Sequence, residues 1–101
     1  MEYEKGKTAY YINLYSINGH IYDGEINKAK IETKHKANSQ YMLYRFNNGE
    51  EHYEYELYPT KRKARKALLK ILTDELDEAT KKYNFFRDTL IENILKNAKV
   101  Y

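Results

Sequence analysis

The chain contains no cysteine, no tryptophan and a single proline among its 101 residues. The lack of cysteine excludes disulfide bonds, thiolate metal sites and a cysteine nucleophile. Glycine is also scarce, with four residues, and no apolar run approaches the length of a membrane span. The start of the sequence does not have the charged and then apolar pattern of a secretion leader. We therefore expect no membrane association and a location in the cytoplasm, which is the host-cell cytoplasm if the protein is viral.

The residues that are abundant are charged residues and tyrosine. Charged residues make up 33% of the chain with both signs mixed, apolar residues make up 42%, and there are 12 tyrosines. This balance predicts one folded domain over residues 1–101 and argues against disorder. The formal net charge of +3 allows an acidic partner. Frequent lysine, asparagine, isoleucine and tyrosine indicate an AT-rich genome, which is common among bacteriophages and mobile elements.

The first Asn-Gly pair predicts a β-hairpin. Residues 8–17 are dense in tyrosine, isoleucine and leucine, and Asn18-Gly19 suits both positive-φ positions of a two-residue type I′ turn. The charged residues 1–7 before this strand predict a loosely held terminus. After the turn, residues 28–37 alternate with period two, which places one side of the strand in water. That side carries a row of lysines, which either protects an edge strand or tracks phosphates: Lys28, Lys30, Lys34 and Lys36.

The second Asn-Gly pair predicts another hairpin, with Asn48-Gly49 at its tip. Counting outward pairs Tyr44 with Tyr53, and it pairs Arg45 with His52. In this register one face of the hairpin enters the core. That face comprises Met42, Tyr44, Phe46, Tyr53, Tyr55 and Leu57.

A helical part follows the only proline. Pro59 ends the last strand, Thr60 suits the N-cap of a helix, and apolar residues recur at helical spacing over residues 61–82. Either a second helix over residues 85–98 then folds back as an antiparallel pair, or one helix of roughly forty residues continues. The continuous helix is favoured because an apolar seam suited to a homodimer runs along it: Leu69, Leu72, Leu76, Tyr83, Phe86 and Leu90.

The predicted fold class is therefore α+β. An antiparallel four-stranded meander with two Asn-Gly hairpins occupies residues 8–58, and it packs on a long C-terminal helix or helix pair within residues 60–98.

The most specific local signal is the cationic start of the helix. Cations there oppose the helix dipole, and together with free amide groups they suit a phosphate or an acidic protein surface. Water can also solvate such a face without any ligand. The candidate cations are Lys61, Arg62, Lys63, Arg65, Lys66 and Lys70.

Catalytic and metal sites are only weakly indicated. His20, His35 and His52 stand on different predicted strands without ligand spacing, so we expect no metal and no cofactor. The predicted register gathers Arg45, His52 and Glu54 on one face, a trio that could move a proton in a ribonuclease-like enzyme. A ladder of surface charge explains the trio equally well. The sequence contains no glycine-rich phosphate loop and no nucleophile elbow.

The leading hypothesis is a small non-catalytic binding protein of phage or mobile-element origin. It would bind and modulate a host or viral protein, for example by inhibiting a host defence factor, and tyrosine is enriched at such interfaces. The alternative is nucleic-acid binding through the basic residues 61–70, and a third hypothesis is the ribonuclease-like enzyme. The expected partners are thus another protein and a second copy of the chain, with nucleic acid as the alternative.

Overall fold

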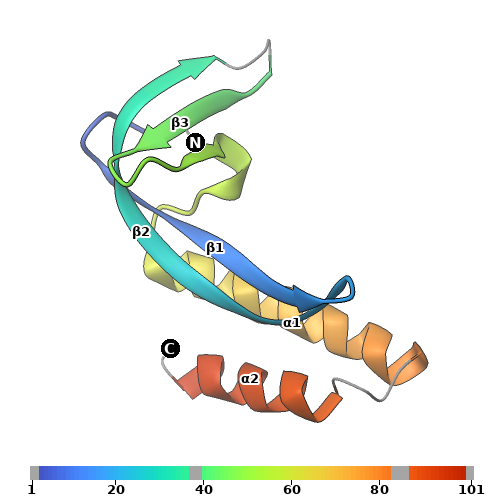
Figure 1. Cartoon of the computed structure of the whole chain (residues 1–101). Helices are drawn as coiled ribbons and strands as arrows, with labels where there is room; N and C mark the ends of the chain where they lie inside the picture. Colours follow the sequence, from blue (N-terminus) through green and yellow to red (C-terminus); the bar gives the residue numbers. More distant parts are fainter. Residues whose placement is uncertain (1–2, 37–39, 83–86, 100–101) are drawn as a thin grey trace. The chain divides into compact units, whose positions relative to one another are not determined.

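A computed structural model describes residues 3–36, 40–82 and 87–99, the side chains of 79–82 excepted. A four-stranded antiparallel sheet in the order β1-β2-β3-β4 precedes two α-helices (Figure 1). The predicted α+β fold and strand order are confirmed. The elements are β1 (Thr8–Ile17), β2 (His20–Lys36), β3 (Met42–Phe46), β4 (Glu51–Tyr53), the 3₁₀ helix η1 (Glu54–Glu56), α1 (Lys61–Lys82) and α2 (Arg87–Lys99).

The chain forms two compact units, each assembled from separate segments. The β unit consists of Met1–Tyr11 and Ile26–Ala64, and the helical unit consists of Ile12–Glu25 and Arg65–Tyr101. The elements β1, β2 and α1 each contribute residues to both units. In the first hairpin, the strand ends far from the turn therefore belong to the β unit, and the part around the turn, residues 12–25, belongs to the helical unit.

The core of the β unit is largely aromatic. Tyr44 and Phe46 of β3 are fully buried, as the sequence predicts. Phe46 packs against Tyr11 of β1 with ring centroids 5.6 Å apart. Leu57 is also buried, and Met42 packs against this core while remaining half-buried. Four of the six predicted core positions of the second hairpin thus contribute to the core.

The residues before β1 are held by the β unit, so the predicted loose terminus is wrong for the described residues. Tyr3 is buried, and its ring meets Tyr44 edge-on at 5.6 Å between centroids. The Tyr3 backbone N–H donates to the Tyr44 hydroxyl at 2.9 Å. Gly6 adopts a φ of +86° and donates its N–H to Ile31 O at 2.8 Å. A buried ring and these hydrogen bonds fix the segment to the sheet.

The last segment of the β unit returns to the first strand. Tyr10 and Tyr58 exchange two backbone hydrogen bonds, with N···O distances of 2.9 and 2.8 Å. At this point β1 has a partner on each side, β2 and the segment that precedes α1. The pairing covers a sheet edge that could otherwise pair with another molecule.

The second hairpin closes with a three-residue loop, residues 47–49, instead of the predicted two-residue turn. Phe46 donates its N–H to Glu50 O at 2.9 Å, and Gly49 donates its N–H to Phe46 O at 3.0 Å. Within the loop only Gly49 has positive φ, at +88°. The Asn48 side chain accepts the Glu50 N–H at 3.0 Å. This Asx turn stabilises a type I turn followed by a left-handed glycine, the usual three-residue hairpin loop.

The longer loop moves the pairing by one residue and reverses the faces of β4. Tyr44 pairs with His52, and Leu43 pairs with Tyr53. Because directly opposed residues share a face, His52 turns toward the core and Tyr53 turns away from it. The predicted core positions of Tyr53 and Tyr55 are therefore wrong, and Tyr55 is 64% exposed.

The helix α1 begins where the sequence predicts. The Thr60 hydroxyl accepts the N–H of Lys63 at 3.1 Å, which makes Thr60 the N-cap. The apolar stripe of α1 includes three fully buried residues: Ala64, Leu68 and Leu72.

The helical part is a helix pair, so the favoured continuous helix is wrong. Within the helical unit, Leu68 of α1 abuts Gly24 of β2, and Asn93 of α2 donates its side-chain N–H to Tyr22 O of β2 at 2.6 Å. A continuous helix would separate residues 68 and 93 by about 37 Å at 1.5 Å per residue. Since Tyr22 and Gly24 are two residues apart, α2 returns along the same hairpin (Figure 1).

The predicted dimer seam is divided between the two helices. Leu72 and Leu90 are 0% and 1% exposed in the single chain, while Leu69 and Leu76 are half-buried. The other two predicted members lie outside the described residues: Tyr83 and Phe86. The homodimer stays a prediction, but the single apolar stripe along one helix that it was predicted to use is not present in the described residues.

No helix in the described part of the chain has the length and apolar character that a membrane crossing requires.

Candidate functional site

Three tyrosines gather on the outer face of the β unit. The rings of Tyr53 and Tyr55 are nearly parallel, with centroids 5.5 Å apart and an interplanar angle of 5°. The ring of Tyr41 stands edge-on to both, 6.3 Å from Tyr53 and 5.2 Å from Tyr55 between centroids. Tyr55 is 64% exposed and Tyr41 is 41% exposed. Ring contacts of this kind hold the three side chains as one surface, which we call the tyrosine cluster.

A 3₁₀ turn places the most exposed ring beside its neighbour. The Tyr53 N–H donates to the Glu56 carboxylate at 3.4 Å, and the Leu57 N–H donates to Glu54 O at 3.2 Å. These bonds close the turn of η1 immediately after β4. The turn therefore brings the ring of Tyr55 against the ring of Tyr53. In an extended strand, residues 53 and 55 would be spaced farther apart along the same face.

Two carboxylates, those of Glu51 and Glu56, lie near the tyrosine cluster. Residues 50–56 include four glutamates, and Glu51 is exposed on the same face of β4 as Tyr53. Desolvation, and then the negative charge of Glu56, raise the pKa of the Tyr55 hydroxyl above its ordinary value. The cluster therefore combines exposed aromatic rings with the nearby carboxylates of Glu51 and Glu56.

The predicted cations of α1 do not all face water. Arg65 is only 8% exposed, and its Nη1 atom has no hydrogen-bond partner among the described residues. Lys70 forms an ion pair with Asp74 at 2.9 Å. Apart from Arg65, the predicted cations are exposed: Lys61, Arg62, Lys63, Lys66 and Lys70. Burial of Arg65 beside the apolar stripe removes one charge from the predicted surface.

A β-bulge interrupts the alternation of β2. Ile31 pairs with Phe46, but the next pair joins Thr33 to Arg45, so Glu32 is an extra residue on β2. An inserted residue exchanges the faces of every side chain that follows it.

The predicted row of four lysines is consequently split between two faces. Lys28 and Lys30 precede the bulge and are exposed on the side away from the core. Lys34 and Lys36 follow the bulge on the side of Tyr44, which pairs directly with Lys34. Lys34 is half-buried there, and its Nζ donates to a backbone carbonyl at 3.3 Å. A continuous phosphate-tracking stripe along β2 is therefore wrong.

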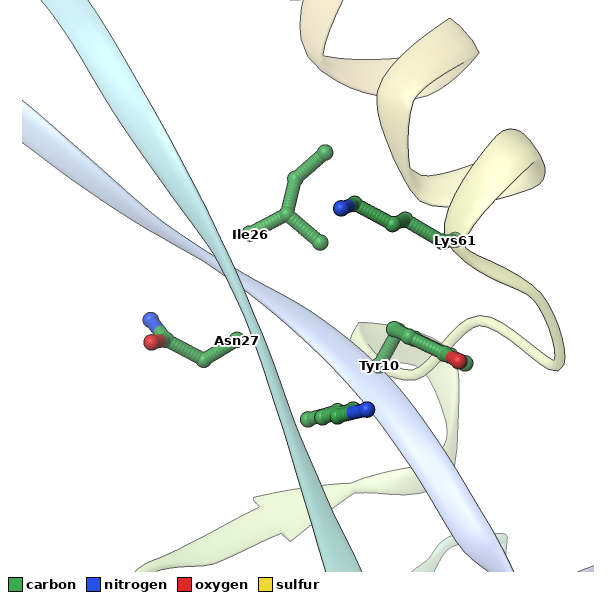
Figure 2. A pocket seen from close by; sticks show the side chains of 5 residues that line it. Tyr10, Ile26, Asn27 and Lys61 are labelled. Atoms are coloured by element: carbon green, nitrogen blue, oxygen red, sulfur yellow. The ribbon is translucent and has the colours of Figure 1, made fainter.

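Two predicted cations meet at one small pocket of the β unit. The pocket has a volume of about 140 Å³, and Lys61 enters it from the first turn of α1 (Figure 2). The rest of its lining is Tyr10 of β1 together with Ile26, Asn27 and Lys28 of β2. A space of this size accommodates a few water molecules or one small anion.

The predicted catalytic trio does not assemble. Since His52 faces the core, Arg45 lies on the opposite face of the sheet. His52 instead lies between two other carboxylates, with Nδ1 3.0 Å from Glu56 and Nε2 3.9 Å from Glu50. Its side chain is only 13% exposed. The histidine is thus packed into the β unit, and the site predicted for Arg45, His52 and Glu54 is wrong.

Among the described residues, no group of three or more histidine, cysteine, aspartate or glutamate side chains could hold a metal ion.

No protein-family model, curated protein or solved structure matches the chain. Its function must therefore be inferred from its own surfaces, and the tyrosine cluster is the one that sequence reasoning missed. The signal that could have revealed it is Asn47, because a second asparagine before Asn48-Gly49 permits a three-residue loop.

Proposed function

We propose that this chain is a small, non-catalytic protein-binding module that docks on a protein partner through the tyrosine cluster. The observation that carries the proposal is the exposure of Tyr41 and Tyr55, at 41% and 64%, on one ordered surface. Tyrosine brings a broad apolar ring and a polar hydroxyl to an interface at low cost in conformational entropy. Clustered aromatic side chains that a folded chain leaves in water are typical of surfaces that a partner covers.

The composition of the chain supports a source and a role for this module. AT-rich coding favours an accessory protein of a bacteriophage or mobile element that acts in the host cytoplasm. Covering a surface of a host or viral protein modulates that protein without any catalytic group, as an inhibitor of a host defence factor would. The partner in this proposal is a protein, and no cofactor is required.

Affinity capture with a double variant tests the proposal. The wild-type chain and the Tyr41→Ser/Tyr55→Ser variant are each used as bait in a nuclease-treated extract of the native host. Because both rings are exposed, their replacement leaves the aromatic core intact. We expect the wild type to recover one protein in stoichiometric amount and the double variant to lose it.

Tyr15→Ser is the matched control, since Tyr15 is 39% exposed in the helical unit. It should recover the partner as the wild type does. Equal recovery by the double variant would contradict the proposal.

A second candidate function is nucleic-acid binding, which the shared pocket of Lys28 and Lys61 favours. Cations that contact phosphates release counterions, so binding of this kind weakens steeply as salt rises. The test is retention on heparin or single-stranded DNA after substitution by glutamine of Lys28 and of the exposed cations at residues 61, 62, 63 and 66. Arg65 is left in place because it is buried. Unchanged retention would exclude this function.

A further inference from the structure

The tyrosine cluster has an aromatic surface that suits a planar cation. The Tyr53 ring lies parallel to one side of the Tyr55 ring, and Tyr41 meets it edge-on. The 64% exposure of Tyr55 therefore leaves much of the ring open to a ligand. A guanidinium group stacks on an aromatic face and is attracted by the negative charge of the π system.

An unpaired carboxylate stands beside these rings. Glu51 is exposed on the face of Tyr53, and in register it lies opposite Arg45. Despite this pairing of Cα positions, Glu51 and Arg45 form no ion pair with each other or with another described residue. The carboxylate of Glu51 is consequently available to an incoming cation, and an arginine can take it as a bidentate partner.

The charge of the surroundings decides between two kinds of partner. The carboxylates of Glu51, on the face of Tyr53, and of Glu56, whose charge acts on Tyr55, repel the phosphates of a nucleic acid, even though bases also stack on tyrosine. Arg45 lies on the same face, opposite Glu51 in register, and offsets part of this negative charge. The two carboxylates outnumber this one cation, so the surroundings of the tyrosine cluster favour a positively charged ligand.

We propose that the tyrosine cluster receives an arginine-bearing segment of the partner protein, with the guanidinium on Tyr55 and its charge balanced by Glu51. This inference deepens the proposed function and rests on it, since both use the same surface. It adds the chemistry of the segment that binds.

Defined peptides test this chemistry directly. The probe is a short fluorescent peptide of alternating arginine and glycine, and its matched control replaces each arginine by citrulline, which has the same shape without the charge. Fluorescence anisotropy with the full chain measures both affinities. We expect saturable binding of the arginine peptide and an affinity for the citrulline peptide that is lower by about 10-fold or more.

Single substitutions locate the bound peptide on the protein. Tyr55→Leu and Glu51→Gln should each lower the affinity for the arginine peptide about 2- to 5-fold, the loss expected for one exposed contact. Tyr15→Leu and Asp77→Asn are the matched controls in the helical unit and should leave it unchanged. Ring resonances of Tyr55 should shift during an NMR titration of the wild type, and amide spectra of each variant check its fold.

Three results would overturn the inference. These are equal affinity for the arginine and citrulline peptides, tighter binding of a single-stranded oligonucleotide than of the arginine peptide, and an affinity that Tyr55→Leu leaves unchanged. The proposed function fails by a different result, which is partner capture that does not depend on Tyr41 and Tyr55. Capture that needs both tyrosines, combined with failure of the arginine peptide, would retain the interface and reject the cationic segment.

Discussion

The β unit and the helical unit fill their cores with different side chains. Tyr44 is fully buried in the β unit, and its hydroxyl accepts the N–H of Tyr3 at 2.9 Å. The helical unit buries leucines from both helices at 0–1% exposure: Leu68, Leu72 and Leu90. A buried tyrosine needs a hydrogen-bond partner as well as a fitting space, whereas a leucine needs only the space. The β unit is therefore stabilised both by the packing of its rings and by hydrogen bonds, and the rings must be packed in the correct position for these bonds to form.

The largest effect is expected from removing a ring of the β unit. Phe46→Ala should lower the free energy of unfolding by about 3–5 kcal/mol, because it leaves a cavity beside the stacked rings of Tyr11 and His52. Those rings lie 5.6 and 5.7 Å from Phe46 between centroids. Urea unfolding measures the loss, and amide hydrogen exchange shows in which unit it occurs.

Leu72→Ala is the counterpart in the helical unit, with an expected loss of about 2–5 kcal/mol. Each substitution should speed exchange most in its own unit. Equal acceleration throughout both units would mean that they unfold together, and the contrast between them would then be one of composition alone.

A smaller loss of stability is expected from adding a methyl group at Gly24, where the first hairpin packs against α1 in the helical unit. In Gly24→Ala the new Cβ would lie 2.6 Å from Leu68 Cδ1 and 3.3 Å from Asn13 O. Because Leu68 is fully buried, it cannot move away freely, and we expect a loss of about 1–3 kcal/mol. Urea unfolding measures this loss.

A double-mutant cycle with Leu68→Ala identifies its origin. If overpacking against Leu68 is the cause, Gly24→Ala should cost less in the Leu68→Ala background. Additive losses would assign the cost to the other close neighbours of the new Cβ, which are Asn13 O and Leu14 Cδ2.

The polar contacts of α2 should contribute less to stability than its buried leucine, Leu90. Asn93 donates to the carbonyl of Tyr22 at 2.6 Å, and Lys96 pairs with Asp23 at 2.9 Å. Asn93→Ala should cost about 1–2 kcal/mol because a partly buried carbonyl loses its donor. Lys96→Gln should cost about 0–1 kcal/mol, since Lys96 is largely exposed.

Thermal unfolding of the two variants ranks these contacts. A larger loss for Lys96→Gln than for Asn93→Ala would reverse the expected order and would make the ion pair the main attachment of α2.

The smallest effect concerns a tyrosine pKa in the hairpin of the helical unit. The Tyr15 hydroxyl donates to Glu25, and this hydrogen bond raises the pKa of Tyr15 above 10.0. Stability from this bond is complete below pH 10 and is lost as the pH rises through the folded pKa, because the folded state then holds a proton that the unfolded state has released. Glu25→Gln should lower the pKa of Tyr15 toward 10.0 in an NMR titration, whereas Glu92→Gln should leave it in place. An unchanged pKa in Glu25→Gln would contradict the assigned bond.

The two units also differ in how far the sequence predicts them. The helical stripe through Leu68 and Leu72 was predicted correctly, and the N-cap at Thr60 was too. Helical faces follow from spacing within one segment, so an error of one residue at an end leaves the buried side unchanged. In the β unit, an error of one residue in the predicted hairpin loop placed His52 and Tyr53 on the wrong faces of the sheet. The predicted site at His52 was therefore wrong, and the tyrosine cluster was missed.

The sequence by itself determined the first three strands, the start of α1, the burial of Tyr44 and Phe46 and the cationic character of residues 61–66, because these depend on neighbouring residues. The predicted last strand, by contrast, ends at Tyr53 and not at Pro59. Tertiary structure decided the loop at Asn48, the bulge after Ile31, the burial of Arg65 and the return of α2. Each of these is a choice between local conformations of similar energy. Packing of distant side chains makes that choice, and in the second hairpin it left the tyrosine cluster in water.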